Sequence, residues 1–275
     1  MIDQYAVIGN PIAHSKSPWI HTEFAKHAKQ PIQYGLLEAD SDERSFIEAI
    51  TAFRDRGGKG ANVTMPFKEM AWNLADTLSE RAKLAGAVNT LSFSPDGQIM
   101  GDTTDGVGLV NDLIINLSVN LKGCKVLVLG AGGAVKGAVQ SLLETEPELL
   151  HIANRTLPRA MDLVDTFGHL GSITASNYDD VSELGVFDVI INATPTNFNG
   201  ELPAVSAQIF SAETLAYDMS YGAVPTLFES WAAEQGAYTS NGLGMLVEQA
   251  AEAFFIWRGI HPQSSQVLSD LRKVL

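Results

Sequence analysis

Short apolar runs that end in turn residues alternate with segments of helical period along the first hundred residues. Runs of this kind predict buried strands, and apolar residues spaced three and four apart predict amphipathic helices. The expected order is β-α-β-α-β-α, followed by two short strands around the turn at 95–97. The predicted strands cover residues 5–8, 34–37 and 61–64, and the predicted helices begin at Ser17, Asp42 and Pro66.

The same alternation restarts after residues 122–123 with an apolar strand that leads directly into glycines. Near the end, apolar residues from Leu243 to Trp257 recur at helical spacing, and so apolar a helix must pack against another layer. Strands that alternate with helices are typical of an α/β protein with a mostly parallel sheet. The predicted strands of this part cover residues 126–129, 149–153, 186–193 and 215–219.

A glycine-rich loop, residues 130–137, lies between the first of these later strands and a predicted helix. Glycines let the backbone approach a pyrophosphate, and a helix N-terminus supplies free N–H groups and the positive end of the helix dipole. The strict G-x-G-x-x-G spacing fails, because Val135 stands where the third glycine belongs. A plain strand-to-helix turn is the alternative, but the context favours a Rossmann-like, dinucleotide-binding fold.

Arginines rather than a carboxylate follow the next predicted strand. NAD-binding chains place an acidic residue about 20 positions after the glycines, where it binds the ribose hydroxyls. At this distance the chain has Asn154, followed by Arg155 and then Arg159. Guanidinium groups form charge-assisted, often bidentate hydrogen bonds with phosphate. We therefore expect NADP rather than NAD, and the alternative is a pair of solvated loop arginines.

The composition narrows the possible partners. The chain has 275 residues and a net charge of −14, which argues against nucleic acid and an anionic membrane surface. No apolar stretch is long enough to span a membrane, and the first residues do not resemble a signal peptide, so we expect a cytoplasmic protein. A single cysteine, Cys124, allows no intramolecular disulfide, and the spacings of His14, His21 and His27 fit no usual zinc pattern, so no metal is expected.

Four polar stretches hold the candidate chemistry of the remaining chain. Two of them, 62–68 and 87–90, follow apolar runs and are therefore expected at the carboxyl ends of strands, where open α/β sheets bind ligands. Together with 14–18 and 102–106 they offer hydroxyl, amide, amine and carboxylate groups. Such a set suits a small, polyhydroxylated ligand.

These stretches resemble those of the shikimate dehydrogenase family, and the resemblance runs nearly end to end. It implies an oxidoreductase acting on a CH–OH group, which reduces 3-dehydroshikimate with NADPH in chorismate and aromatic amino-acid biosynthesis. The matching motifs are GNPIAHSKSP from Gly9, GANVTMPFK from Gly60, GAVNT from Gly86, TDGVG from Thr104, GAGGA from Gly130, NRT from Asn154, YDMSY from Tyr217 and GLGMLVEQA from Gly242.

The resemblance also implies roles for individual residues. Lys68 would be the catalytic acid and base, with Asp105 beside it. Ser15 and Ser17, with Tyr221 nearby, would bind the substrate carboxylate, and Thr64, Asn89, Asp105 and Gln249 would bind the ring hydroxyls. NADP would contact Gly130, Ala131, Gly132, Gly133, Ala134, Asn154, Arg155, Thr156 and Arg159, with Met219 and Gly242 near the nicotinamide and Glu80 also near the cofactor.

Three of these residues have plainer alternatives. Lys68 alone would be interpreted as a surface lysine on an amphipathic helix. Ser17 could serve only as a helix N-cap, since serine favours that position. Gln249, within an apolar helical pattern, could be a core amide whose partners are backbone groups.

The resemblance further implies two domains with the active site in the cleft between them. Residues 1–105 and 243–275 would form the substrate domain, because Gln249 belongs with the motifs of the first hundred residues, and 106–242 would bind NADP. Two alternatives remain: a broader quinate/shikimate dehydrogenase, and a non-catalytic NADP-binding regulatory module. Both a monomer and a homodimer are compatible with the sequence.

Overall fold

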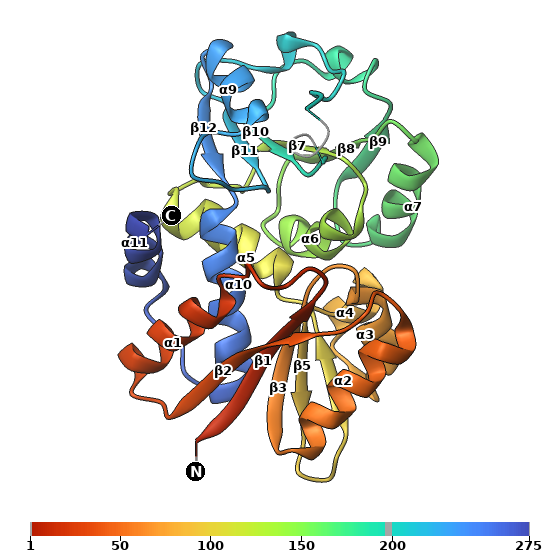
Figure 1. The fold of residues 1–275 in the computed structure, drawn as a ribbon. Coiled ribbons are helices and arrows are strands. Elements are labelled where there is room, and N and C mark those ends of the chain that lie inside the picture. Colours follow the sequence, from red (N-terminus) through yellow and green to blue (C-terminus); the bar gives the residue numbers. More distant parts are fainter. Residues whose placement is uncertain (1, 196–199, 275) are drawn as a thin grey trace. The chain divides into compact units, whose positions relative to one another are not determined.

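The chain forms two compact α/β units, each built around one six-stranded sheet (Figure 1). The computed structural model describes residues 2–195 and 200–274. The first unit contains the chain up to Gly108 and Val247–Val274, and the second contains Leu109–Leu246. The predicted α/β fold class is confirmed. Among the described residues, no helix is long and apolar enough to cross a membrane.

The first unit has a mixed sheet of strand order β2-β1-β3-β5-β6-β4. Strand β1 pairs in parallel with β2 and β3, whereas β5 is antiparallel to both β3 and β6. Its elements are β1 (Asp3–Gly9), α1 (Ser17–Ala28), β2 (Ile32–Glu38), α2 (Glu43–Asp55), β3 (Gly58–Val63), α3 (Lys68–Leu74), β4 (Thr77–Leu78), α4 (Glu80–Ala85), β5 (Thr90–Phe93), β6 (Ile99–Asp102), the start of α5 (Asp105–Asn111), the end of α10 (Leu243–Arg258) and α11 (Ser264–Val274).

Both faces of this sheet are covered. Successive side chains of a strand point to opposite faces. On one face, Ile8 packs with Phe46 and Phe67, which belong to the side of α2 and α3. On the other face, Val7 belongs to a second buried cluster, and Trp257 of α10 packs against it. This explains why β1 is a continuous apolar run rather than an alternating one. The carboxyl edge of the sheet is left for loops.

The second unit has a fully parallel sheet of order β12-β11-β10-β7-β8-β9. If the strands of this unit are numbered 1 to 6 from β7 to β12, their order across the sheet, starting at β9, is 3-2-1-4-5-6. This is the Rossmann arrangement, and the strand order reverses between β7 and β10. Its elements, after the rest of α5, are a π-helix (Asp112–Asn116), β7 (Lys125–Leu129), α6 (Gly133–Leu143), β8 (Leu149–Ala153), α7 (Leu157–Phe167), β9 (Ile173–Ser176), a 3-10 helix (Val181–Leu184), β10 (Val189–Asn192), a 3-10 helix (Ala207–Ile209), β11 (Leu215–Asp218), α9 (Leu227–Glu234), β12 (Tyr238–Asn241) and the start of α10.

Some sequence predictions of local structure are wrong. Ser17 is the first residue of α1 and not its N-cap; that position belongs to Lys16, which makes no side-chain capping bond. Strands β9 and β12 were not predicted. Strand β12 has the sequence Tyr-Thr-Ser-Asn, which contains no apolar run. The short elements β4 and α4 were missed as well, although Ser79 caps α4 through a bond from the Ala82 N–H.

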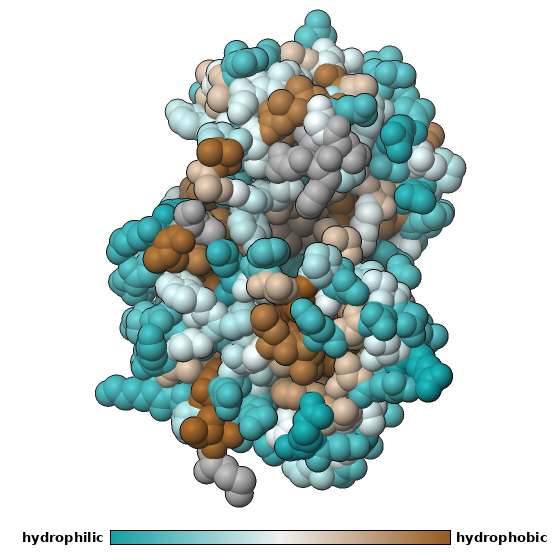
Figure 2. Space-filling model, viewed as in Figure 1, coloured by the Kyte–Doolittle hydropathy of each residue, from teal (hydrophilic) through white to brown (hydrophobic). Residues whose placement is uncertain are grey.

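Polar residues cover most of the face shown in Figure 2, and apolar residues form separate patches among them. This agrees with a sequence that carries 32 acidic residues. Scattered apolar groups are normal on protein surfaces. They therefore identify no partner by themselves.

Candidate active site

The carboxyl edge of the first sheet gathers polar residues from separate parts of the sequence. Thr64 follows β3 at this edge, and Asp105 comes shortly after β6. Asn89 lies there too, because it precedes β5, which is antiparallel to β3: the Val63 N–H donates to the Asn89 carbonyl at 2.8 Å. The expectation that the 87–90 stretch follows a strand is therefore wrong, yet its side chains reach the expected edge.

Lys68 and Asp105 form an ion pair at this edge. Lys68 is the first residue of α3, and its Nζ lies 2.5 Å from Asp105 Oδ2. The Lys68 side chain is 29% exposed and that of Asp105 is 11% exposed, so the pair is partly accessible at the lysine and mostly enclosed at the carboxylate. A charge-assisted bond of this kind fixes the position of the ammonium group.

Asn89 connects this pair with neighbouring groups. Its Nδ2 donates to Asp105 Oδ1 at 2.8 Å, and Gln249 Oε1 of α10 lies 3.4 Å from the same nitrogen. Its Oδ1 accepts from the Thr104 backbone N–H at 2.9 Å. The structure thus brings Lys68, Asn89, Asp105 and Gln249 into one cluster, although they are spread over most of the sequence.

The remaining residues predicted to bind substrate occupy two places. Ser15 and Ser17 lie between β1 and the first turn of α1, and the Ser17 N–H donates to Ser15 Oγ at 3.3 Å. The connection that carries them starts at the same sheet edge, since β1 runs parallel to β3. Tyr221, in contrast, belongs to the second unit, where it follows β11.

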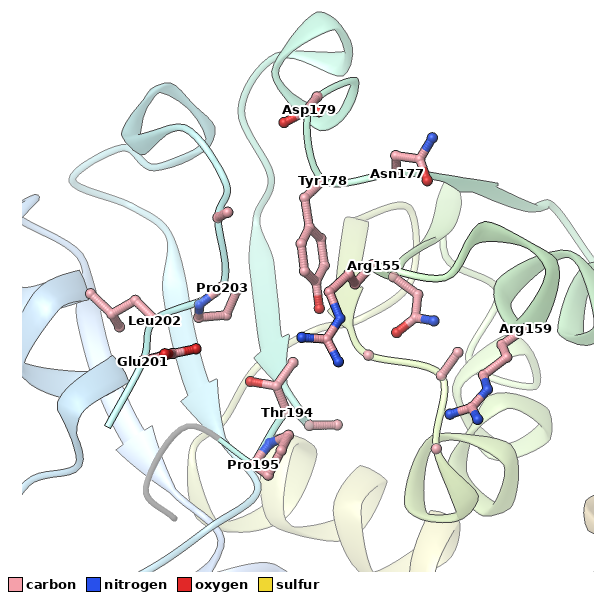
Figure 3. Close-up of a pocket in the computed structure, with 16 residues that line it drawn as sticks. Arg155, Arg159, Asn177, Tyr178, Asp179, Thr194, Pro195, Glu201, Leu202 and Pro203 are labelled. Atoms are coloured by element: carbon pink, nitrogen blue, oxygen red, sulfur yellow. The ribbon is translucent and has the colours of Figure 1, made fainter. Parts of the chain in front are cut away.

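The second unit has a cavity of about 650 Å³ at the carboxyl ends of β7, β8, β9 and β10, close to the reversal of strand order (Figure 3). Gly130 lines it with φ = +111°, a conformation that favours glycine, and a Cβ there would lie 3.3 Å from the Ala193 carbonyl oxygen. Behind it, Gly132 caps the 11-residue helix α6. The geometry fits a dinucleotide pyrophosphate above a helix N-terminus.

Two arginines after β8 and a tyrosine after β9 line the cavity (Figure 3). Arg155 and Arg159 present guanidinium groups to it, as a 2′-phosphate requires. Burial raises the pKa of the Tyr178 hydroxyl. The tyrosine hydroxyl lies close to Arg155 in the cavity (Figure 3).

The predicted cofactor residues are divided between this cavity and other places. Gly130, Ala131, Gly132, Asn154, Arg155 and Arg159 line it. Gly133 and Ala134 begin α6 behind the loop, and Thr156 is the N-cap of α7. Met219 and Gly242 lie together at the ends of β11 and β12, where a Cβ on Gly242 would clash with the Met219 carbonyl oxygen. Glu80 belongs to the first unit and pairs with Lys83 on the surface.

Sequence reasoning missed the other wall of the cavity. Asn177, Tyr178 and Asp179 follow β9, and Glu201 to Ala204 come from the segment after β10. No motif marked them, and β9 itself was not predicted. The useful signal was topological: residues after any strand beside the point of reversal are candidates to line the ligand site. In the part of the chain that the structure describes, no group of three His, Cys, Asp or Glu residues is placed to hold a metal ion.

Comparisons with known proteins identify the family of the chain. Three family models match: the shikimate dehydrogenase substrate-binding domain over residues 7–91, shikimate/quinate 5-dehydrogenase over 113–199, and the shikimate 5′-dehydrogenase C-terminal domain over 242–268. A relative named shikimate dehydrogenase (NADP(+)) from Vibrio campbellii is 52% identical over 100% of this chain and 98% of its own length. The chain belongs to the shikimate dehydrogenase family.

Solved structures share this fold, and one of them is a shikimate dehydrogenase with ligands bound. That from Thermus thermophilus in complex with NADP(H) and shikimate is 31% identical, with a TM-score of 0.87 and 100% of each chain covered. An Ael1 enzyme from Pseudomonas putida is 44% identical, with a TM-score of 0.92 and 98% of each chain covered. The family assignment made from the sequence motifs is thereby confirmed.

Proposed function

We propose that this chain catalyses the reversible, NADPH-dependent reduction of 3-dehydroshikimate to shikimate. The observation that carries the proposal is the Lys68–Asp105 pair at 2.5 Å, gathered with Asn89 and Gln249 at the sheet edge. The names of its relatives, including an NADP(H) and shikimate complex, support the same reaction. The chain would act in chorismate and aromatic amino-acid biosynthesis, in the cytoplasm.

The first unit binds the substrate in this proposal. Ser15 and Ser17 hydrogen-bond the carboxylate, with Tyr221 contributing from the second unit, and Thr64, Asn89, Asp105 and Gln249 bind the ring hydroxyls. When the ketone gains a hydride, its oxygen becomes an alkoxide that needs a proton. Lys68 donates that proton, and in the reverse direction it removes the proton from the hydroxyl. Proton transfer by a placed side chain contributes about 10²–10⁴-fold to the rate.

The second unit binds NADP, whose nicotinamide supplies or accepts the hydride when the cofactor is bound. The residues fit this cofactor. The glycine loop and the start of α6 offer backbone N–H groups to the pyrophosphate, and Arg155 and Arg159 offer guanidinium groups to the 2′-phosphate. Thr156 contacts the cofactor, Met219 and Gly242 lie near the nicotinamide, and no metal takes part.

Steady-state absorbance at the NADPH band tests the proposal, with shikimate or quinate combined with NADP or NAD. Turnover of shikimate with NADP alone is the expected result. Comparable rates with quinate or NAD would favour a broader enzyme, a possibility raised by the family description "shikimate/quinate" and by a Listeria monocytogenes structure described with shikimate and NAD. A folded, NADP-binding protein inactive with every pair would instead be a regulatory module. Sedimentation of the same sample would decide between monomer and homodimer.

A further inference from the structure

A chain of buried hydrogen bonds runs across the first sheet, behind the proposed catalytic pair. It consists of Tyr34 on β2, Asn62 on β3 and Thr90 on β5, with exposed fractions of 8%, 6% and 0%. Tyr34 OH donates to Asn62 Oδ1 at 2.6 Å, and Asn62 Nδ2 donates to Thr90 Oγ1 at 3.2 Å. Thr90 Oγ1 then donates to Asn89 Oδ1 at 2.8 Å. The sequence assigned none of the three to substrate binding.

Two backbone groups fix the direction of every bond in this chain. The Asn89 carbonyl, which can only accept, lies 3.3 Å from the Asn62 side chain, so the amide group of Asn62 must present Nδ2 there. The Thr104 backbone N–H, which can only donate, lies 2.9 Å from the Asn89 side chain, so Asn89 must present Oδ1 there. The hydrogen-bond partners therefore determine which atom of each amide group is the oxygen and which is the nitrogen.

The fixed orientations pass on to the hydroxyl groups. Because Asn62 Oδ1 can only accept, Tyr34 must donate to it. Because Thr90 Oγ1 already accepts from Asn62, its proton is free to go to Asn89 Oδ1. The result is that Asn89 turns Nδ2 toward Asp105 Oδ1, which leaves Asp105 Oδ2 to Lys68.

The Tyr34 end of the chain is held in the core. Burial raises the pKa of Tyr34 well above its ordinary value, so this group stays protonated and can donate to Asn62. The Tyr34 ring is held by stacking on His21, with ring centroids 4.2 Å apart and planes 5° apart.

We propose that Tyr34, Asn62 and Thr90 are positioning residues, which hold the Asn89 amide rigidly in the orientation that the Thr104 N–H selects and so keep Asp105 placed beside Lys68. The inference rests on the proposed function, because it assigns the pair a catalytic role. Without the donor at Thr90, Asn89 Oδ1 keeps only groups of Thr104 as donors, and the amide gains freedom to rotate. An Asn89 turned by 180° would direct a carbonyl oxygen at the Asp105 carboxylate and repel it.

The test compares Thr90→Val, which keeps the side-chain shape but removes the hydroxyl, with Thr90→Ser, which keeps the hydroxyl. We expect Thr90→Val to lower kcat about tenfold with KM for shikimate changed less than about threefold, since small misplacement of catalytic groups costs rate steeply. Thr90→Ser should restore kcat to within about twofold of the wild type. Wild-type turnover, measured first, decides the proposed function, and the ratio of variant to wild type decides the inference.

A second pair of variants guards against a purely structural effect. Tyr34→Phe removes the first donor, and Tyr5→Phe removes another buried hydroxyl of the same unit, one that lies 3.4 Å from Arg258 and away from the site. Only Tyr34→Phe should lower kcat, even where both variants lower Tm. If Thr90→Val fails to fold, this pair decides the question by the same criterion.

A double-mutant cycle completes the test. If Thr90 acts through Asn89, adding Thr90→Val to Asn89→Ala should change kcat less than about twofold. The inference would be overturned if the fold-change in kcat of the double variant equalled the product of the two single fold-changes. It would also be overturned if kcat were unchanged in both Thr90→Val and Tyr34→Phe.

Discussion

Replacement of Arg155 by alanine probes the cofactor site independently of catalysis. Arg155 lies on the loop between β8 and α7 and directs its guanidinium into the 650 Å³ cavity, which Arg159 of α7 also lines (Figure 3). The residue is exposed, so truncation leaves no buried group without a partner in the protein. Any loss of affinity should therefore report the contact with the ligand.

The expected loss follows from the type of contact. A hydrogen bond to a charged group contributes about 1.5–3 kcal/mol. At a factor of ten for each 1.4 kcal/mol, the Kd for NADPH should rise about 10- to 150-fold. NADH has no 2′-phosphate, so its Kd should change less than about threefold. Because the site is exposed, the difference should shrink as salt is added.

Calorimetric titration with NADPH and NADH at fixed ionic strength measures both constants. Lys122→Ala serves as the matched control, because Lys122 is an exposed cation of the same unit that pairs with Glu146 and does not line the cavity. It should leave both constants near the wild-type values. An equal loss for NADPH and NADH in Arg155→Ala would refute the 2′-phosphate role.

Two further substitutions test the first unit. In steady-state assays, Lys68→Ala should lower kcat by about 10²-fold or more with little change in KM. The control Lys83→Ala, which removes an exposed cation, should leave kcat unchanged. A near-normal kcat in Lys68→Ala would exclude the acid–base role. Burial lowers the pKa of His21 to about 3, so below about pH 6.5 the unfolded chain binds a proton that the folded chain does not. The free energy of unfolding should therefore decrease as the pH falls. In urea unfolding, the wild type should lose about 2 kcal/mol more than His21→Phe when the pH is lowered from about 7 to about 5. Equal losses in the two proteins would contradict this.

The fold class, the glycine loop and the family could all be predicted from the sequence, because local patterns suffice for them. A buried parallel strand such as residues 126–129 is a continuous apolar run, and a loop that must take φ = +111° at Gly130 needs glycine. The arginines after β8 were also visible, because their distance from the glycines is set by the length of one strand–helix unit.

Which residues share a site depends instead on how distant segments pair. Asn89 was assigned to the right edge for the wrong reason, since it precedes β5, and an antiparallel pairing with β3 returns it to that edge. Strand direction depends on pairing between distant segments, which no local pattern records. The same holds for the cavity wall at Tyr178 and for the buried chain from Tyr34 to Asn89: each joins residues whose contact exists only because separate strands pair in one order.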